Sequence, residues 1–256
     1  MRWRFFVSPA ADGPYNMALD EALMRRASQA GSATFRVYSW STPTLSFGRN
    51  QRARDCYDAD VAEELGVRFV RRPTGGRALL HHREVTYSAT LPLAAADDPR
   101  DAYDFINRVL IAGLGRFGVD AGPPAAPRSL RPGLRPCFDL PAEHEIAVDG
   151  RKLVGSAQWR HGGALLQHGS ILVRDDQPLI ARLLKNGSLG TTTAAATLGD
   201  VLGWEPSVEQ VAEAILESLR EATGCPIGTF AVEAALEADM TLLQAAYADD
   251  SWTWRR

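Results

Sequence analysis

The fold is decided by residues 149–170, which read DGRKLVGSAQWRHGGALLQHGS. Asp149-Gly150 is a dipeptide that tight hairpin turns prefer, and the residues after it alternate as a β-strand does. We expect strands at 143–148, 152–160 and 164–173, with the first two joined by that turn. Consecutive strands joined by short turns predict an antiparallel sheet.

Alternating strand and helix patterns continue on both sides of this region. On its amino side, apolar periodicity predicts strands at 3–7, 34–40, 44–47, 67–71 and 84–93, and helices at 14–30, 57–65 and 102–117. On its carboxyl side, residues 178–256 are mainly helical in pattern, with helices at 179–184, 208–222 and 232–246. The sequence therefore predicts an α+β (loosely α/β) fold: one domain over 1–256 with a central, largely antiparallel sheet flanked by helices.

Composition limits the classes of function. The chain has 256 residues, of which 45% are hydrophobic and 23% are charged, as in an ordinary globular protein. A formal charge of −3 gives no general basic field, so we expect no nucleic acid partner. The chain has no apolar run of the roughly 18 residues that a membrane span needs, and its start does not resemble a signal peptide. We expect a cytoplasmic protein without a membrane partner.

Cysteine and lysine are rare in this chain, so their positions are informative. The cysteines stand at positions 56, 137 and 225, a spacing that fits neither a zinc site nor a disulfide framework. Among 28 basic residues only Lys152 and Lys185 are lysines. Because the rest of the chain uses arginine, a lysine indicates a position that needs a compact ammonium group. The alternative is that the lysine arose by chance under a composition bias.

Two segments combine glycine or proline with polar or titratable residues. Residues 71–77 read RRPTGGR, where Gly75-Gly76 lets the backbone approach a ligand and turn N–H groups toward it; a plain β-turn with solvated arginines is the alternative. Residues 121–136 contain five prolines, which predict a surface loop, and Cys137 follows at its end. A cysteine in that place is reachable by solvent.

The predicted hairpin supplies a third segment. The small residues at 155–157 leave room for a ligand along the strand that begins at Lys152. An ammonium near a thiol lowers the thiol's pKa and stabilises a developing oxyanion, as thiol acyl transfer requires. Cys137 and Lys152 are close enough in sequence for the loop to fold over the strand.

Five ordered motifs carry a resemblance to a known family. They are residues 16–21 (NMALDE), 47–51 (FGRNQ), 71–77, 84–88 (EVTYS), and 150–158 with 168–170. Together they resemble the biotin and lipoate protein ligase family, with a motif core at about 3–175. The chain is most similar to the cysteine-dependent octanoyltransferases that modify the glycine cleavage H protein. The family's nucleophile falls on Cys137 and its active-site lysine on Lys152.

The resemblance implies a sheet with helices around a tunnel for a medium-length acyl chain. It also implies transfer of an octanoyl group from octanoyl-acyl carrier protein, through a thioester on Cys137, to a lysine of a lipoyl carrier domain such as the glycine cleavage H protein. No ATP, metal or other cofactor is expected, since thioester to amide is downhill. The expected substrate-binding residues are Arg71, Arg72, Thr74, Gly75, Gly76, Arg77, Gly155, Ser156, Ala157, Gln158, His168, Gly169 and Ser170.

Alternative functions stay open at this point. An ATP-dependent lipoate ligase would use residues 71–77 as an adenylate cradle, an amidotransferase would move octanoyl between carriers, and a non-catalytic relative would only bind acyl chains. The chain also departs from the family where His82 replaces a common Asp, which puts in doubt any hydrogen bond assigned to that carboxylate.

Other polar residues have structural interpretations. His168 is expected to be a structural donor in the site wall, and Asp20-Glu21 to pair with nearby arginines rather than to act as paired acids. His144 is a weaker candidate for a Cys/His pair with Cys137. We expect Cys56 and Cys225 to be inert, and Trp252 and Trp254 to pack the carboxyl-terminal tail.

Overall fold

The computed structural model describes residues 1–93, 99–124, 145–185, 194–230 and 234–256. The strands are β1 (Arg2–Val7), β2 (Ser32–Tyr38), β3 (Thr44–Phe47), β4 (Arg68–Arg71), β5 (Leu79–His81), β6 (Glu84–Pro92), β7 (Ile146–Val148), β8 (Arg151–His161), β9 (Ala164–Leu172) and β10 (Gly228–Thr229). The helices are α1 (Gly13–Ala30), α2 (Ala59–Glu64), α3 (Pro99–Gly115), α4 (Leu179–Leu183), α5 (Leu198–Leu202), α6 (Val208–Thr223), α7 (Ala234–Ala248) and α8 (Asp250–Thr253).

Among the described residues, seven strands form the larger sheet, in the order β10-β1-β2-β6-β9-β8-β7. The pairs from β2 to β7 are antiparallel, and only β1 runs parallel to its two neighbours. The predicted turn joins β7 to β8: Asp149 and Gly150 both have positive φ, at 50° and 72°, as a tight hairpin requires. The predicted α+β fold with a largely antiparallel sheet is confirmed.

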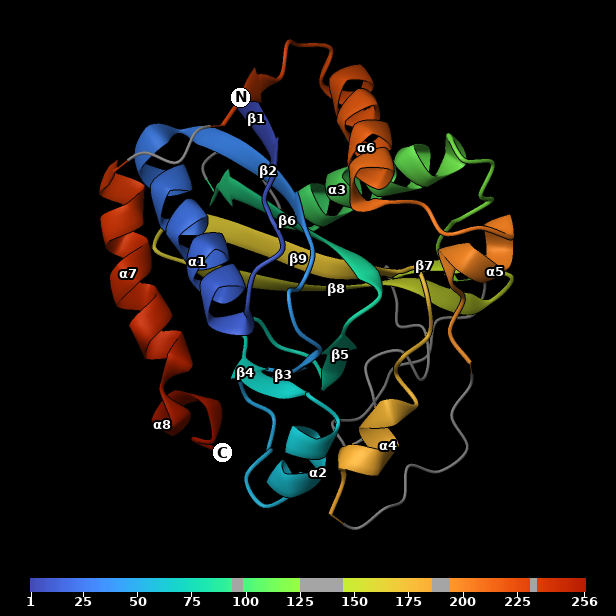
Figure 1. Ribbon diagram of the computed structural model, residues 1–256. Helices are drawn as coiled ribbons and strands as arrows, with labels where there is room; N and C mark the ends of the chain where they lie inside the picture. The colour runs from blue at the N-terminus through green and yellow to red at the C-terminus, as the bar shows by residue number, and fades with distance from the viewer. Residues whose placement is uncertain (94–98, 125–144, 186–193, 231–233) are drawn as a thin grey trace.

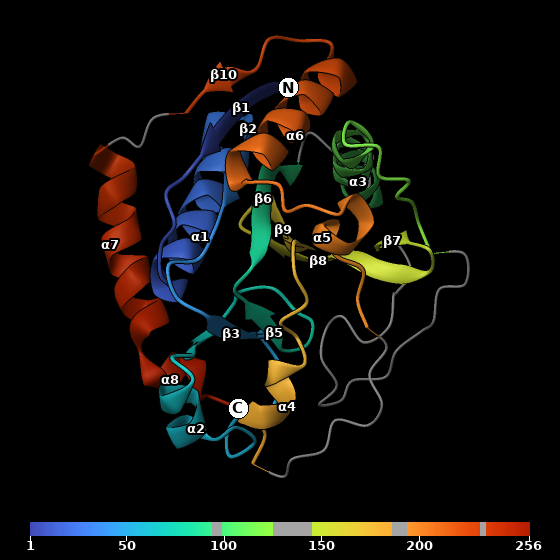
Figure 2. The same ribbon diagram turned by 45° about the vertical axis from the view of Figure 1, so that its right-hand side comes forward.

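Helices cover both faces of this sheet (Figures 1 and 2). On one face, α1 packs against β6 and β9 and is itself covered by α7. On the other face, α3 and α6 pack against each other and enclose the main apolar core, to which Phe35, Tyr87, Ile106 and Ile215 belong. The sheet is therefore buried on both faces, which places polar residues of its strands inside the protein.

The ends of α1 have local causes. The Asp12 side chain accepts a hydrogen bond from the N–H of Tyr15, Pro14 stands in the first turn, and Gly31 ends the helix with a φ of 58°. The helix places Asp20 toward the sheet, where it is fully buried.

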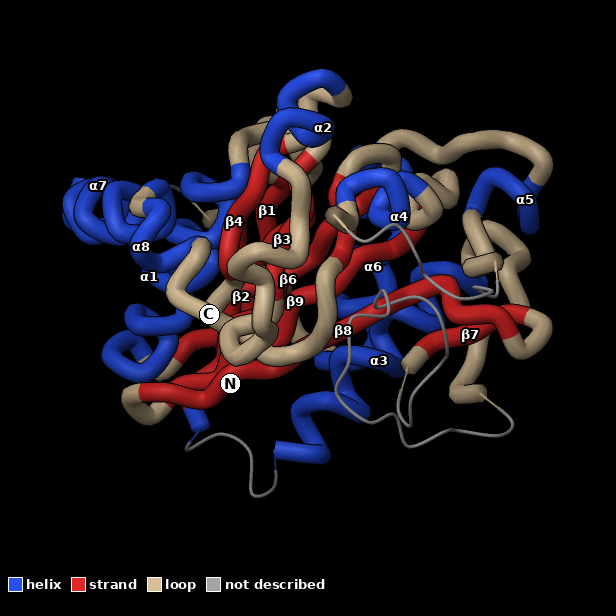
Figure 3. Tube along the Cα trace, turned by 90° about the horizontal axis from the view of Figure 1, so that it is seen from below, coloured by secondary structure: helices blue, strands red, loops and turns tan. Residues whose placement is uncertain are grey.

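A smaller sheet, β4-β3-β5, lies beside the carboxyl ends of β2 and α7, with α2, α4 and α8 around it (Figures 1 and 3). Its own apolar cluster includes Phe47, Tyr57 and Leu80. The ring of Trp254 packs on Phe47 and Phe69, so the tail packs as the sequence predicts. This sheet supplies the glycine-rich segment after β4.

Most predicted elements are present, with bounds that differ by at most three residues. The sequence does not predict the short segments α5, α8 and β10, because two to five residues give too little periodicity. Cys137, His144 and most of the proline-rich segment lie outside the described residues. In the part of the chain that the structure describes, no helix is long and apolar enough to cross a membrane.

Candidate functional site

A cavity of about 200 Å³ opens between the β8–β9 hairpin, β6 and the segment after β4. Its lining residues are Met17, Tyr38, Trp40, Arg72, Gly76, Arg77, Leu79, His81, Thr86, Glu145, Gly155, Ser156, Ala157, His168, Gly169 and Ser170. Several of these side chains are apolar or aromatic, and the others are polar or charged. Such a mixture suits a ligand with an apolar body and a polar reacting end.

Most of the predicted substrate-binding residues lie on this cavity. The lining includes Arg72, Gly76, Arg77, Gly155, Ser156, Ala157, His168, Gly169 and Ser170. The others, Arg71, Thr74, Gly75 and Gln158, lie close by in the same segments but do not line it. The structure therefore brings the segment after β4 and the β8–β9 hairpin together, as the sequence predicts.

Arg71 has a structural place instead. Its guanidinium is buried and donates to the carbonyl oxygens of Gly48, Gln51 and Thr253, at 2.7 to 2.9 Å. Burial, together with repulsion by nearby arginines, lowers the pKa of Arg71 to about 10. The side chain thus ties the carboxyl terminus to the loop after β3.

Lys152 lies at the start of β8, beside an irregularity in the pairing of β7 with β8. Its side chain is 1% exposed, and Nζ donates to Oε1 of Glu145 at 2.5 Å. Glu145 itself lines the cavity. The ion pair makes burial of the ammonium tolerable and holds it next to the cavity. Glu145 had no part in the predicted site, because its lone carboxylate carries no motif.

The hairpin wall depends on a glycine. Gly169 lies opposite Ser156, and a Cβ at position 169 would stand 2.5 Å from the Gly155 carbonyl oxygen. Only glycine therefore permits this close approach.

Tyr87 hydrogen-bonds Ser156 Oγ at 2.6 Å and accepts from Gln167, and burial raises the pKa of Tyr87 to about 12. The phenol remains a neutral hydrogen-bonding group.

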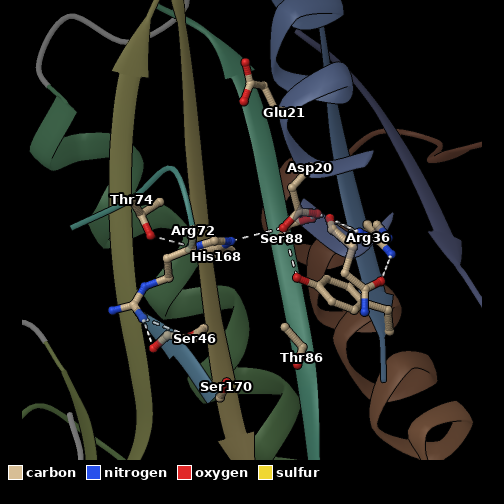
Figure 4. Close-up of polar contacts among 12 residues, drawn as sticks. Asp20, Glu21, Arg36, Ser46, Arg72, Thr74, Thr86, Ser88, His168 and Ser170 are labelled. Carbon is tan, nitrogen blue, oxygen red and sulfur yellow. Dashed lines mark hydrogen bonds and ion pairs between the residues drawn. The ribbon is translucent and has the colours of Figure 1, made fainter. Parts of the chain in front are cut away.

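The first of two polar chains begins at Asp20 on α1; we call Asp20, His168 and Thr74 the Asp20 chain (Figure 4). Oδ2 of Asp20 lies 3.1 Å from Nδ1 of His168, whose Nε2 lies 2.7 Å from Oγ1 of Thr74. Oδ1 accepts from Arg36 at 2.8 Å and from Ser88 at 2.7 Å. The prediction that Asp20 pairs with an arginine is confirmed, and His168 lies in the cavity wall, bonded to Asp20 and Thr74.

The protonation of the Asp20 chain follows from its surroundings. Burial alone raises the pKa of Asp20, but the hydrogen bond from His168 and the charge of Arg36 outweigh it, so the pKa lies below 3.8. Burial lowers the pKa of His168 below 6.5. A neutral imidazole that donates from Nδ1 to a carboxylate must accept at Nε2, so the Thr74 hydroxyl donates to it.

The second chain begins at Glu84 on β6; we call Glu84, His81 and Ser46 the Glu84 chain. Oε1 of Glu84 lies 2.6 Å from Nδ1 of His81, whose Nε2 lies 2.8 Å from Oγ of Ser46. Oε1 also accepts from Thr86 and Ser170. The Trp40 ring stacks on the His81 ring with 4.0 Å between centroids. Ser46 Oγ in turn accepts from Arg72 at 2.9 Å.

Both chains order a hydroxyl, an imidazole and a carboxylate as hydrolase triads do, but neither hydroxyl can attack a substrate. Ser46 and Thr74 are fully buried and do not line the cavity. Ser46 Oγ is also held by a guanidinium, which opposes its activation. The Asp20 chain ends at Thr74, and the Glu84 chain ends at Ser46, whose hydroxyl oxygen accepts from Arg72.

The sequence predictions missed His81 and Glu84 as parts of the site. The available indication was the alternation of Glu84, Thr86, Ser88 and Thr90 along β6, which marks one polar face of a strand. A polar strand face normally indicates solvent, whereas here α1 packs on β6 and His81 of β5 bonds Glu84, so the face is buried.

Comparison with known proteins places this arrangement in a family. The model of the lipoyl protein ligase A/B catalytic domain matches residues 12–220. The chain belongs to this family. The match includes both polar chains, Lys152 and every residue that lines the cavity.

Curated members of the family resemble the chain over its whole length. Octanoyltransferase LipM from Kyrpidia tusciae is 37% identical over 271 residues, covering 99% of both chains. Octanoyltransferase LipM from Staphylococcus aureus is 32% identical, again covering 99% of both.

Solved structures of the family share the fold. Lipoate-protein ligase A bound with ATP superimposes with a TM-score of 0.81 at 21% identity, covering 99% of both chains. A bi-partite lipoate protein ligase from Thermoplasma acidophilum gives 0.79 at 20% identity, covering 99% of this chain and 96% of the other. The lipoyl protein ligase A/B fold is thus shown by structure as well as by sequence.

Proposed function

We propose that this chain is an octanoyltransferase of lipoate biosynthesis that works through a thioester on Cys137. The donor is octanoyl-acyl carrier protein, and the acceptor is a lysine of a lipoyl carrier domain of the glycine cleavage H protein type. The observation that carries the proposal is the similarity, over 99% of the chain, to octanoyltransferases. The cavity and the buried Lys152 support it.

The cavity suits the acyl chain. Met17, Trp40 and Leu79 give it apolar walls, and each methylene that leaves water there contributes about 0.8 kcal/mol. The polar lining groups, among them Glu145 and the residues after β4, receive the thioester end. Binding energy from the remote chain thereby positions the reacting carbonyl.

The reaction takes two steps. The Cys137 thiolate attacks the thioester carbon, and the tetrahedral intermediate expels the carrier's thiolate, which takes up a proton. The amine of the acceptor lysine then attacks the octanoyl-cysteine, loses a proton and expels the Cys137 thiolate. The products are an amide and the starting enzyme, so no ATP is consumed.

Lys152 is the residue that favours the charged states of this reaction. Its ammonium carries three N–H donors, and Nζ donates to Glu145. A positive charge beside the thiol favours the thiolate, and later the oxyanion. The N–H groups of Gly75 and Gly76 are the other candidates for oxyanion binding.

Intact-protein mass spectrometry after mixing with octanoyl-acyl carrier protein, without ATP, tests the proposal. We expect one octanoyl adduct on the parent chain. Neutral hydroxylamine should remove it, because hydroxylamine cleaves a thioester but does not cleave an amide. Cys137→Ala abolishes the adduct, whereas the matched double variant Cys56→Ala/Cys225→Ala retains it. Lys152→Ala slows its formation.

The opposite results identify the competing functions. Transfer that requires ATP and free acid, with pyrophosphate release, would make the chain a ligase. An adduct that survives in Cys137→Ala would contradict the cysteine mechanism. Adduct formation only from an octanoyl carrier domain would make the chain an amidotransferase, and bound octanoyl without a covalent bond would leave only an acyl-binding protein.

A further inference from the structure

We propose that Ser46, His81 and Glu84 are positioning residues that hold Arg72, and through Arg72 the glycine loop (residues 74–77), in the shape that octanoyl transfer requires. The inference rests on the proposed function, which gives the glycine loop its task of binding the oxyanion. None of the three residues was expected at the site, and Ser46 and Glu84 do not line the cavity.

Arg72 is the link between the Glu84 chain and the glycine loop. Its Nη1 donates to the Ser46 hydroxyl oxygen at 2.9 Å and to the Ser46 carbonyl oxygen at 3.1 Å. Its Nη2 donates to the carbonyl oxygens of Gly75 at 2.9 Å and Arg77 at 2.7 Å. One planar guanidinium thus joins β3 to the glycine loop, and its plane sets the direction of two loop carbonyls.

The other carbonyl groups of the glycine loop are also directed at the protein. Thr74 O accepts from the N–H of Arg49 at 2.7 Å. A Cβ at Gly48 would stand 2.0 Å from Gly76 O, so the Gly76 carbonyl lies directly against the backbone at position 48. In a trans peptide the N–H points opposite to the carbonyl. Fixing the carbonyls therefore fixes where the N–H groups point.

These N–H groups are available to a ligand. Within the described residues, the N–H groups of Gly75 and Gly76 donate to no protein acceptor. Gly76 lines the cavity and has a φ of 95°, a conformation that glycine adopts without strain. Preorganised backbone donors of this kind are what stabilises a developing oxyanion, provided that the loop does not move.

The hydrogen bonds of the Glu84 chain run in one direction. A carboxylate only accepts, so His81 donates from Nδ1 to Glu84. In the tautomer that carries its proton on Nδ1, Nε2 accepts from the Ser46 hydroxyl, whose oxygen accepts from Arg72. Every hydrogen along the chain then has one acceptor. Because such bonds polarise one another, the carboxylate charge at one end strengthens the hold on the guanidinium at the other.

Glu84 keeps one oxygen without a partner. Oε1 accepts from three side chains, whereas Oε2 is buried and accepts no hydrogen bond from the described residues. A buried oxygen without a hydrogen-bond partner costs free energy. If the only task of residue 84 were to accept the hydrogen bonds made to Oε1, a residue without the second, unpartnered oxygen would make the protein more stable. The retained charge fits a role in fixing Arg72.

The test uses Ser46→Ala, which removes the hydroxyl between His81 and Arg72 but leaves His81 bonded to Glu84 and Arg72 bonded to the backbone carbonyl at position 46. The matched control is Thr90→Val: Thr90 is fully buried on β6, and its hydroxyl has no partner among the described residues. We expect Ser46→Ala to slow formation of the octanoyl adduct about tenfold, with affinity for octanoyl-acyl carrier protein unchanged within about twofold. Thr90→Val keeps the parent rate, and Ser46→Thr, which restores the hydroxyl, recovers most of it.

A second measurement does not depend on activity. In ¹⁵N-labelled protein, Ser46→Ala shifts or broadens the amide resonances of Gly75 and Gly76, and Thr90→Val leaves them unchanged. Parent-like resonances and a parent-like rate in Ser46→Ala would overturn the inference while leaving the proposed function intact. If the parent forms no adduct at all, the proposed function fails, and the two glycine resonances alone decide whether Ser46 holds the loop.

Discussion

Asp20 and Glu84 are two buried carboxylates whose chains hold the same segment, yet their charges are treated differently. Both oxygens of Asp20 accept hydrogen bonds, and the buried Arg36 guanidinium pairs with one of them. Glu84 has three donors on one oxygen and none, among the described residues, on the other. Among the described residues, no arginine side chain bonds Glu84; the link to Arg72 runs through His81 and Ser46.

The contrast teaches that similar polar chains can serve different ends. The Asp20 chain is a closed ion-pair network, so we expect its loss to cost stability first. The Glu84 chain is incompletely satisfied and transmits its charge toward Arg72, so we expect its loss to cost activity first. Substitutions that treat the two carboxylates alike separate these expectations.

Asp20→Asn is expected to have the largest effect on stability. The substitution keeps the shape but leaves the Arg36 guanidinium, which is fully buried, without its counter-charge. Breaking a buried pair on one side costs about 3–5 kcal/mol in the free energy of unfolding. Urea denaturation checks this, and a loss below about 1 kcal/mol would contradict the description of Asp20 as part of a closed ion pair.

Thr86→Val is expected to cost about 1–2 kcal/mol, because it removes the acceptor of the Trp40 indole N–H and one donor to Glu84. Thr90→Val, four residues further along β6, removes a hydroxyl that has no partner in the described part of the chain. We expect that control to be neutral or slightly stabilising in thermal denaturation. Equal losses of stability in Thr86→Val and Thr90→Val would mean that packing, and not hydrogen bonding, sets the effect of both substitutions.

Glu84→Gln is expected to change stability by about 1 kcal/mol or less, because the amide oxygen still accepts the bonds made to Oε1 and a desolvated charge is removed. Acylation by octanoyl-acyl carrier protein should slow several-fold, since the hold on Arg72 weakens. Paired measurements of unfolding and adduct formation check both halves. If Glu84→Gln were as unstable as Asp20→Asn, the proposed difference between the Asp20 chain and the Glu84 chain would be wrong.

The smallest effect concerns pH. Burial lowers the pKa of His168 below 6.5, so on acidification the unfolded chain binds a proton before the folded protein does. The free energy of unfolding should therefore decline as the pH falls below about 6.5, and the lowered pKa of Asp20 adds a second decline below about 3.8. His168→Gln should remove the first decline, whereas His161→Gln, at an exposed position, should keep it.

Much of this protein could be predicted from local pattern. The Asp149-Gly150 turn, the caps and apolar face of α1, and the alternation of β6, β8 and β9 are properties of short segments, so their elements are where the sequence places them. The segment after β4 and the small residues of β8 were also recognisable, because glycines beside charged residues are unusual in a core. The pairing of Cys137 with Lys152 stays a prediction.

The sequence by itself determined the elements, their polar and apolar faces, and the family to which the chain belongs. Only the tertiary structure decided that the polar face of β6 is buried, that Glu145 receives Lys152, and that Ser46 from β3 joins His81 to Arg72. The physical reason is that these contacts connect residues from different elements, whose meeting depends on how α1 and the smaller sheet pack on the larger one. Local periodicity records which side chains share a face, and packing alone sets what covers that face.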